Sequence, residues 1–295
     1  MILPHFFNLG DFIYPINSIF LLVMKRSTRR EIAKNTLKVL KQGYYLNGMG
    51  KTIGLKSKQK FSTQNTQLFS GEELNELLEV LNNEKPFDTV FEVTEETTLA
   101  AILRLQTEDN DLLTLNFASA KNPGGGFLNG SQAQEESLAR STGLYPCQLK
   151  AEKYYIQHRK NKTPFYSDNM IYSPMVAVFR NDHGDFLEDP AFSSFITSPA
   201  VNAGVIKRQF PEEEGKIESV MKTRISKMLA LAHSKGHKTL ILGAWGCGVF
   251  ENEPPAIAQW FQDAFSTIFE GKFEKVVFAI YSRDEKYIQP FKELF

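Results

Sequence analysis

From residue 90 to the C-terminus, short apolar runs alternate with amphipathic segments, and this alternation constrains the fold more than any other feature. The run LLTLNF at 112–117 is typical of a buried strand, and amphipathic helical segments lie between such runs. Strands that alternate with helices predict an α/β sheet with helices on both faces. With 295 residues and 42% hydrophobic content, the chain can build this as one large domain. Ligands of such folds bind at the C-terminal ends of the strands.

The pattern assigns the elements as follows. Strands are expected at 90–93, 112–117, 170–180 (broken at Pro174), 195–206 (one or two short strands), 239–242 and 275–280. Helices are expected at 72–82, 99–106, 132–139, 154–158, 217–234 and 255–269, with a further one that starts at a Thr28/Glu31 capping box and ends at Gly43. A second capping box, Ser70 with Glu73, precedes the helix at 72–82, and the polar stretch 48–67 is expected to be loop with short strands.

Residues 12–24 (FIYPINSIFLLVM) form an apolar run near the N-terminus. Thirteen residues are too few to span a bilayer, and the positive charges follow the run, whereas those of a secretory signal precede it. Positive charges on this flank also suit a membrane-proximal anchor that faces the cytoplasm. We favour a non-core N-terminal extension at residues 1–23, of native or non-native origin, and a single domain at residues 24–295. Within that domain, residues 24–85 are expected to form a helical accessory region and residues 86–295 the core.

Charge and cysteine content narrow the function classes. Lys+Arg and Asp+Glu both number 34, so nothing in the net charge argues for bulk electrostatic binding of nucleic acid. The only two cysteines, Cys147 and Cys247, provide neither a disulfide framework nor a zinc site. With only two cysteines, a reducing, cytoplasmic compartment is the simplest interpretation. We further expect a monomer that uses no metal or cofactor and does not bind nucleic acid or membrane.

The first candidate for chemistry is the sequence NPGGG at residues 122–126, which follows the strand at 112–117. Three glycines allow the backbone to approach a ligand closely, and their N–H groups can face an anion. Gln134, Glu135 and Glu136 follow at the start of a helix, where a carboxyl group can act as acid or base. Because neighbouring side chains on a helix diverge by about 100°, the two glutamates are not expected to aim at one atom.

A second glycine-rich loop, GAWGCGVF at 243–250, follows the strand at 239–242. A glycine turn that leads into a helix N-terminus is a ready anion site, and Asn252 is expected to cap that helix ahead of Pro254 and Pro255. Phe250 can pack on a sugar or base, or belong to the core. Cys247 is expected to be a small residue in a tight loop rather than a nucleophile.

Three further patterns are rejected as sites. The sequence GMGKT at 48–52 imitates a P-loop, but its first required glycine is replaced by Tyr45. His233 and His237 lack an acid that would complete a metal site, and we expect them near a helix C-terminus. The acids between 182 and 189 lack calcium-loop spacing, which favours a solvated turn.

The run 116–145 resembles the signature of poly(ADP-ribose) glycohydrolases, a GGG separated by six to eight residues from QEE; here the spacer is seven residues, 127–133. The segments SPMVAVFR (173–180), ITSPAVNAG (196–204) and LGAWGCGVFEN (242–252) are similar to further segments of the compact microbial type. The resemblance extends from about Met24 to the C-terminus. It implies a macrodomain-like three-layer α/β/α fold with a mixed sheet and a helical N-terminal extension.

The resemblance also implies hydrolysis of ribose–ribose O-glycosidic bonds in poly(ADP-ribose) from the chain end, which releases ADP-ribose. Glu136 is implied to be the catalytic acid, and Glu135 to bind ribose hydroxyls. The other implied substrate-binding residues are Asn122, Gly124, Gly125, Gly126 and Gln134 in the first loop and helix, and Gly246, Cys247, Gly248, Val249 and Phe250 in the second loop. Residues 246–249 would hold the diphosphate, and Phe250 the distal ribose.

Two other functions remain open at this stage. The pocket can belong to a module that binds ADP-ribose without cleaving it, or to an enzyme that acts on mono-ADP-ribosyl bonds. The pair of glutamates distinguishes an enzyme from a pure binding module, which does not need it.

Overall fold

The computed structural model describes residues 24–106 and 111–295, so the expected extension 1–23 lies outside the described residues. Its centre is a seven-stranded mixed sheet in the order β3–β6–β7–β5–β8–β9–β4. The strands are β3 (Gln67–Phe69), β4 (Val90–Thr94), β5 (Leu112–Phe117), β6 (Met170–Arg180), β7 (Phe186–Ser198), β8 (Thr239–Leu242) and β9 (Lys275–Ala279). From β7 to β4 neighbouring strands are parallel, whereas β6 is antiparallel to both β7 and β3.

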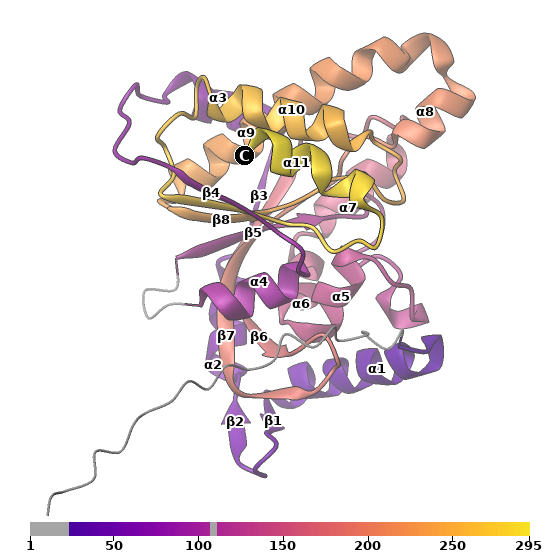
Figure 1. Ribbon diagram of the computed structural model, residues 1–295. Coiled ribbons are helices and arrows are strands. Elements are labelled where there is room, and N and C mark those ends of the chain that lie inside the picture. The colour runs from indigo at the N-terminus through magenta and orange to yellow at the C-terminus, as the bar shows by residue number, and fades with distance from the viewer. Residues whose placement is uncertain (1–23, 107–110) are drawn as a thin grey trace, which may run out of the picture.

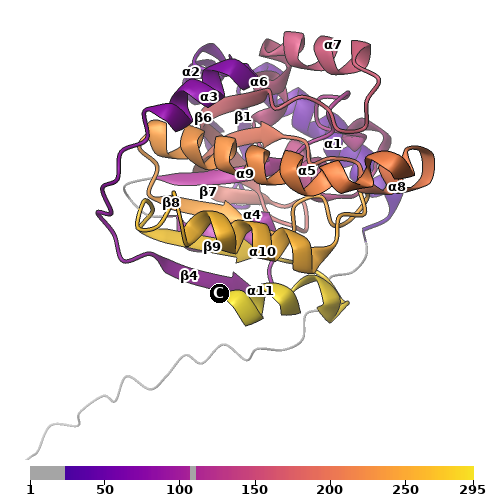
Figure 2. The same ribbon diagram turned by 90° about the horizontal axis from the view of Figure 1, so that it is seen from above.

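Helices cover both faces of this sheet, which confirms the expected three layers (Figures 1 and 2). One face carries α3 (Gly71–Glu79), α9 (Ile217–Ser234), α10 (Pro254–Phe265) and α11 (Gln289–Leu294). The other carries α4 (Thr98–Leu105), α5 (Gln134–Ser141) and α6 (Leu144–Lys150). The largest cluster of buried side chains lies on the first face, where Trp245, Phe261 and Phe278 are fully buried. Burial of such side chains is the main favourable term in folding.

The region before residue 86 is joined to the sheet. It contains α1 (Arg26–Gln42), a hairpin of β1 (Tyr44–Leu46) and β2 (Thr52–Gly54), and α2 (Lys56–Gln64), followed by β3 and α3. β3 pairs with β6 and extends the main sheet by one strand, so this region is packed as part of the same body. The sequence GMGKT forms the turn of the β1–β2 hairpin, in agreement with rejection of a P-loop.

The sequence predicts some of the helix ends correctly and others not. The Ser70/Glu73 capping box is confirmed, with both reciprocal hydrogen bonds formed. Gly43 ends α1 in the left-handed conformation, as expected. The Thr28 cap is wrong, because α1 begins at Arg26 and Thr28 lies inside its first turn.

Several expected elements are also wrong in extent or type. α2 occupies a stretch expected to be loop, α6 was not expected, and α8 (Ala203–Gln209) replaces the end of an expected strand. β6 is continuous through Pro174 because a register shift between Ser173 and Val176 accommodates the proline, which has no N–H to donate. The remaining helices are α7 (Glu152–Lys160) and the short 3-10 segments η1 (Phe127–Asn129), η2 (Pro211–Lys216) and η3 (Glu285–Tyr287). Among the described residues, no helix is long and apolar enough to cross a membrane.

Candidate active site

Both glycine loops lie at one edge of the sheet, as the sequence predicts, because β5 and β8 are parallel neighbours and each loop follows the carboxyl end of its strand. In the first loop, Gly124 and Gly125 adopt positive φ values of +66° and +57°, a region that favours glycine. A Cβ at Gly125 would lie 2.4 Å from Oε1 of Glu136 and 3.2 Å from Oε2 of Glu135. The absence of a side chain at Gly125 therefore allows both carboxyl groups to approach the loop.

Glu135 is a buried carboxyl group. Its side chain is 3% exposed, and it accepts hydrogen bonds from the Ser119 backbone N–H (2.6 Å), Gln148 Nε2 (2.8 Å) and Asn116 Nδ2 (3.2 Å). Burial raises the pKa of Glu135 to about 8, and the three donors offset part of that rise. Glu135 is therefore held in one orientation and retains a proton at neutral pH.

Glu136 lies on the outer side of the same helical turn and is partly exposed. Its Oε1 accepts a hydrogen bond of 2.9 Å from the Gly126 N–H. The Gly125 N–H donates to the Asn122 carbonyl, 3.0 Å away, so the first loop directs these two donors inside the protein and not toward a free anion site. The loop thus holds one oxygen of Glu136. The expectation that the two glutamates point to separate places is wrong in part, since both reach the space beside Gly125.

Gln134 connects helix α5 to strand β5. Its Oε1 accepts from the Phe117 N–H (2.8 Å), and its Nε2 donates to the Leu115 carbonyl (2.7 Å). Both ends of this amide are thus bonded to backbone groups of β5, which places the start of α5 against the strand end. The side chain of Asn122 is exposed on the loop.

The second loop is shaped by Asn252. Its Nδ2 donates to the Val201 carbonyl (2.9 Å) and the Gly246 carbonyl (3.2 Å), and Gly246 has φ +77°. The expected capping role of Asn252 is wrong, because Glu253 precedes the first helical residue, Pro254, and no side chain caps α10. Asn252 instead ties the loop to the segment that follows β7.

This second loop offers free backbone donors. Within the described part of the chain, the N–H groups of Gly248, Val249 and Phe250 have no hydrogen-bond partner. Val249 is 78% exposed, whereas Cys247 is buried and burial raises the pKa of its thiol well above the ordinary range. Consecutive free N–H groups in a glycine-rich turn suit a phosphate, and the buried thiol of Cys247 is unreactive. Phe250 is half-buried, with its ring 5.9 Å from that of Tyr166.

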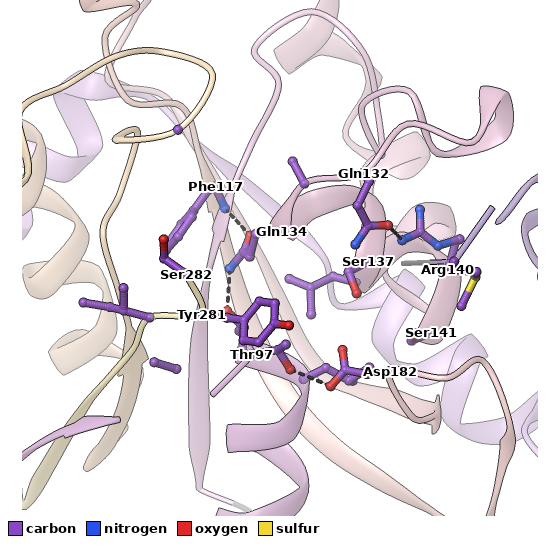
Figure 3. Close-up of a pocket in the computed structure, with 18 of the residues that line it drawn as sticks. Thr97, Phe117, Gln132, Gln134, Ser137, Arg140, Ser141, Asp182, Tyr281 and Ser282 are labelled. Atoms are coloured by element: carbon purple, nitrogen blue, oxygen red, sulfur yellow. Dashed lines mark hydrogen bonds between the residues drawn. The ribbon is translucent and has the colours of Figure 1, made fainter. Parts of the chain in front are cut away.

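A cavity of about 490 Å³ adjoins this edge (Figure 3). Phe117, Gln134, Gly248 and Tyr281 line it at the strand ends, and α4, α5 and the start of α1 enclose it further in. Its residues on α5 include Gln134 and Ser137 but neither glutamate, so the two carboxyl groups lie on another side of that helix.

Asp182 lines the inner part of this cavity. It accepts a 2.6 Å hydrogen bond from Thr97 Oγ1, and burial raises its pKa. The solvated turn expected for Asp182 is therefore wrong for this residue. His237 is likewise not a plain helix cap, because it lies between Asp111 and the Tyr172 hydroxyl. Within residues 24–106 and 111–295, no group of three or more His, Cys, Asp or Glu side chains could hold a metal ion.

Sequence reasoning missed Gln148 and Asn116, the two amides that hold Glu135. Asn116 is the penultimate residue of β5, a position from which its side chain could have been placed at the site. Gln148 belongs to α6, and no sequence signal distinguished it. Oδ1 of Asn116 and Oε1 of Gln148 are buried without a partner, so each amide retains an acceptor.

A mixed α/β sheet that places paired carboxyl groups and free loop N–H groups at one strand edge defines a hydrolase of macrodomain-like architecture. The family model for the microbial-type PARG catalytic domain matches residues 33–181, which is about half of the chain. A comparison with curated proteins finds no match.

Solved structures extend this similarity over most of the chain. Poly(ADP-ribose) glycohydrolase from Thermomonospora curvata is 41% identical, with a TM-score of 0.88 over 91% of this chain and 100% of that one. The same enzyme bound to the inhibitor ADP-HPD gives a TM-score of 0.83 at the same identity and coverage. The Deinococcus radiodurans enzyme in complex with ADP-ribose is 40% identical, with a TM-score of 0.77 over 80% of this chain and 96% of that one. The chain belongs to the family of microbial-type poly(ADP-ribose) glycohydrolases.

Proposed function

We propose that this glycosidase hydrolyses ribose–ribose O-glycosidic bonds of poly(ADP-ribose) with Glu136 as its single general acid and base. The observation that carries the proposal is the approach of the Glu135 and Glu136 carboxyl groups to Gly125, next to a second loop with free N–H donors. A ribose beside Gly125 can meet both carboxyl groups while its diphosphate lies on the second loop. Relatives solved with ADP-ribose and with ADP-HPD support a substrate of this class.

The order of the parallel strands supports one orientation of the substrate along this edge of the sheet. β5, β8, β9 and β4 are successive neighbours, and their carboxyl ends lie at the same edge. The distal ribose lies at the β5 loop, the diphosphate at residues 246–250 after β8, and the adenosine in the cavity beside Tyr281, which follows β9. The cavity volume lies within the range of small-molecule sites.

The chemical step assigns different tasks to the two glutamates. Glu136 donates its proton to the leaving ribose oxygen as the bond to the anomeric carbon breaks, and then takes a proton from the water that attacks this carbon. The positive charge that develops on the sugar is stabilised by the diphosphate held close to it. Glu135 binds ribose hydroxyls, and since it retains a proton at neutral pH, it can donate as well as accept.

The residues that enclose the cavity support attack from the chain end. Met24, just before α1, and Arg29 and Ile32 of α1 line it away from the strand ends. With the adenosine in this cavity, the wall beside it would limit the space for a further ADP-ribose unit, which supports binding of the last unit of the polymer. We also propose a domain plan in which residues 24–85 form an accessory region that provides this wall, and residues 86–295 the core.

The same proposal includes the compartment, the oligomeric state and the binding partners of the enzyme. The enzyme acts as a cytoplasmic monomer on poly(ADP-ribose) or ADP-ribosylated macromolecules, without direct contact with nucleic acid or membrane. The buried free thiols of Cys147 and Cys247 fit a reducing compartment.

The test is release of ADP-ribose from poly(ADP-ribose) by the full chain and by Glu136→Gln. We expect release to fall by at least about 10³-fold in the variant while ADP-ribose binding, measured by calorimetry, is retained. Glu152→Gln, which neutralises an exposed carboxylate at the start of α7, is the matched control and should behave like the parent chain. Tight ADP-ribose binding without release by the parent chain would identify a binding module or an enzyme for another ADP-ribosyl linkage.

A further inference from the structure

The net charge of the chain is zero, but its positive and negative residues are distributed unevenly along the sequence. Residues 25–64 contain 11 of the 34 Lys and Arg residues and one of the 34 Asp and Glu residues, a net charge of +10 that is balanced by −10 elsewhere. This segment comprises α1, the β1–β2 hairpin and α2. A local excess of this size marks a surface for a polyanion, which the whole-chain charge does not reveal.

On α1 the cations form one stripe, which we define as Arg26, Arg30, Lys34, Lys38 and Lys41. Successive members from Arg26 to Lys38 are four residues apart, so at about 100° per residue the five lie within a sector of about 120°. All five are exposed, and none forms an ion pair with any acid of the described residues. The stripe follows a helix of 17 residues, about 25 Å long.

The stripe begins beside the active-site loop. Arg26 Nε donates to the Asn129 carbonyl (2.9 Å), and a Cβ at Gly130 would lie 2.9 Å from Cγ of Arg30. Gly130 is four residues after Gly126, whose N–H binds the Glu136 carboxylate. The first cations of the stripe therefore lie at the end of the loop segment that begins at Gly126.

The far end of the stripe carries exposed aromatic rings. α1 ends at Gln42, and Tyr44 of β1, two residues later, is 42% exposed. Phe61 of α2 is 50% exposed on a helix whose Lys56 packs against the end of α1 at Gly43. A row of cations that ends at exposed aromatic rings suits a chain that carries both phosphates and bases, since a base can stack on a ring.

We propose that the stripe and the rings of Tyr44 and Phe61 form an extended binding site for the undegraded part of poly(ADP-ribose). The inference rests on the proposed function, because it follows the polymer away from the bond that is cleaved. With the terminal unit in the site, the scissile bond at Glu136 joins it to the penultimate unit, whose diphosphate reaches Arg26 and Arg30 first. Lys34, Lys38 and Lys41 bind phosphates further along, and the rings stack on adenines.

Such a site strengthens the binding of long polymers and does not change the binding of single ADP-ribose units. Each exposed cation that binds a phosphate contributes modestly, and the contribution falls with salt as counterions are released. The site therefore lowers KM for long chains at low salt without changing kcat, since none of its residues touches the reacting atoms. The affinity for ADP-ribose itself is independent of the stripe.

The experiment uses the full chain with Lys34→Gln and Lys38→Gln together. The matched control is Lys150→Gln with Lys153→Gln, which removes two exposed lysines on α6 and α7. We expect the stripe variant to bind long poly(ADP-ribose) about three- to tenfold more weakly at low salt, measured in the Glu136→Gln background to prevent hydrolysis. The slope of log affinity against log salt should flatten by about 1.4, on the scale of single-stranded nucleic acids. KM for long polymer should rise to a similar extent in the active chain.

Two results would overturn the inference. One is long-polymer affinity in the stripe variant equal to that of the control pair. The other is binding of a single-stranded RNA of equal phosphate number as tight as that of the polymer and equally sensitive to the stripe, which would identify a nucleic-acid surface. Failure of the catalytic proposal is separate, because it appears as absence of ADP-ribose release by the parent chain whatever the stripe binds.

Discussion

The buried carboxyl group of Glu135 makes the stability of this enzyme depend on pH in a direction that Glu135→Gln should remove. Glutamine has nearly the size of glutamate but cannot ionise. Its carbonyl can accept from the Ser119 N–H, and its NH₂ can donate to the unpartnered acceptor of Gln148 once that amide turns over. The variant therefore keeps the packing and the hydrogen bonds of a protonated Glu135.

The direction and the magnitude of this pH dependence follow from the raised pKa of Glu135. Below pH 4.5 the folded and unfolded states both hold the proton, and above about pH 8 both have released it. Between these values only the folded state holds it, so the free energy of unfolding falls as pH rises, by about 1.4 kcal/mol for each pH unit. From pH 5 to pH 8 the parent chain should therefore lose about 4 kcal/mol relative to Glu135→Gln.

Urea unfolding at pH 5, 6.5 and 8, followed by fluorescence and circular dichroism, measures this difference. Because other groups titrate in both proteins, the relevant quantity is the free energy of unfolding of Glu135→Gln minus that of the parent chain. We expect it to increase steadily with pH.

Parallel curves for Glu135→Gln and the parent chain would refute the reasoning. They would mean that the three donors around Glu135 compensate its burial completely and that the residue is ionised at neutral pH. Its proposed role as a donor to ribose hydroxyls would then fail, whereas the role of Glu136 would be unaffected.

Three other substitutions test the packing described above. Asp168→Asn should lower the free energy of unfolding, measured with urea at pH 7, by about 3 kcal/mol, because it leaves the fully buried Arg224 without its anion. A loss below about 1 kcal/mol would contradict this. Gly125→Ala should abolish ADP-ribose release, since its Cβ would clash with Glu136 in a backbone conformation of φ +57°, while the thermal midpoint falls by only a few degrees. Ser70→Ala should lower the free energy of unfolding by about 1 kcal/mol through loss of a capping box, and Ser57→Ala, at an exposed site on α2, serves as its control.

The sequence predicts best those elements whose bounds are marked by residues close to them in the chain. β5, α9 and β8 have the expected bounds, because each combines a clear apolar period with a turn or a glycine at its end. β6 was expected to break at Pro174, and only its partner β7 explains why it does not, since the register shift that accommodates the proline is made between two strands. α8 was mistaken for strand because seven residues are too few to show a helical period.

The two loops and the carboxyl pair were located from composition, but their internal contacts depend on distant residues. Asn252 was taken for a helix cap because it precedes two prolines, and its actual partner, the Val201 carbonyl, is 51 residues away in the chain. Gln148 holds Glu135 from a helix that the sequence did not indicate. A pattern of neighbours along the chain cannot contain such contacts, because the sheet brings these residues together only after folding.

The difference between Glu135 and Glu136 shows why the tertiary contacts matter for mechanism. The two are identical neighbours on one helix, and α5 alone gives them the same dipole and the same propensity. Packing of α6 surrounds Glu135 with protein and supplies Gln148, whereas Glu136 remains open to ligand and solvent and, among the described residues, is held by the Gly126 N–H alone. A proton that must be passed to substrate and recovered from water is better carried by the group that solvent can reach. A ribose that must be held in one orientation is better served by the group with three fixed donors, and this division of tasks requires Gly125, beside both carboxyl groups, to remain without a side chain.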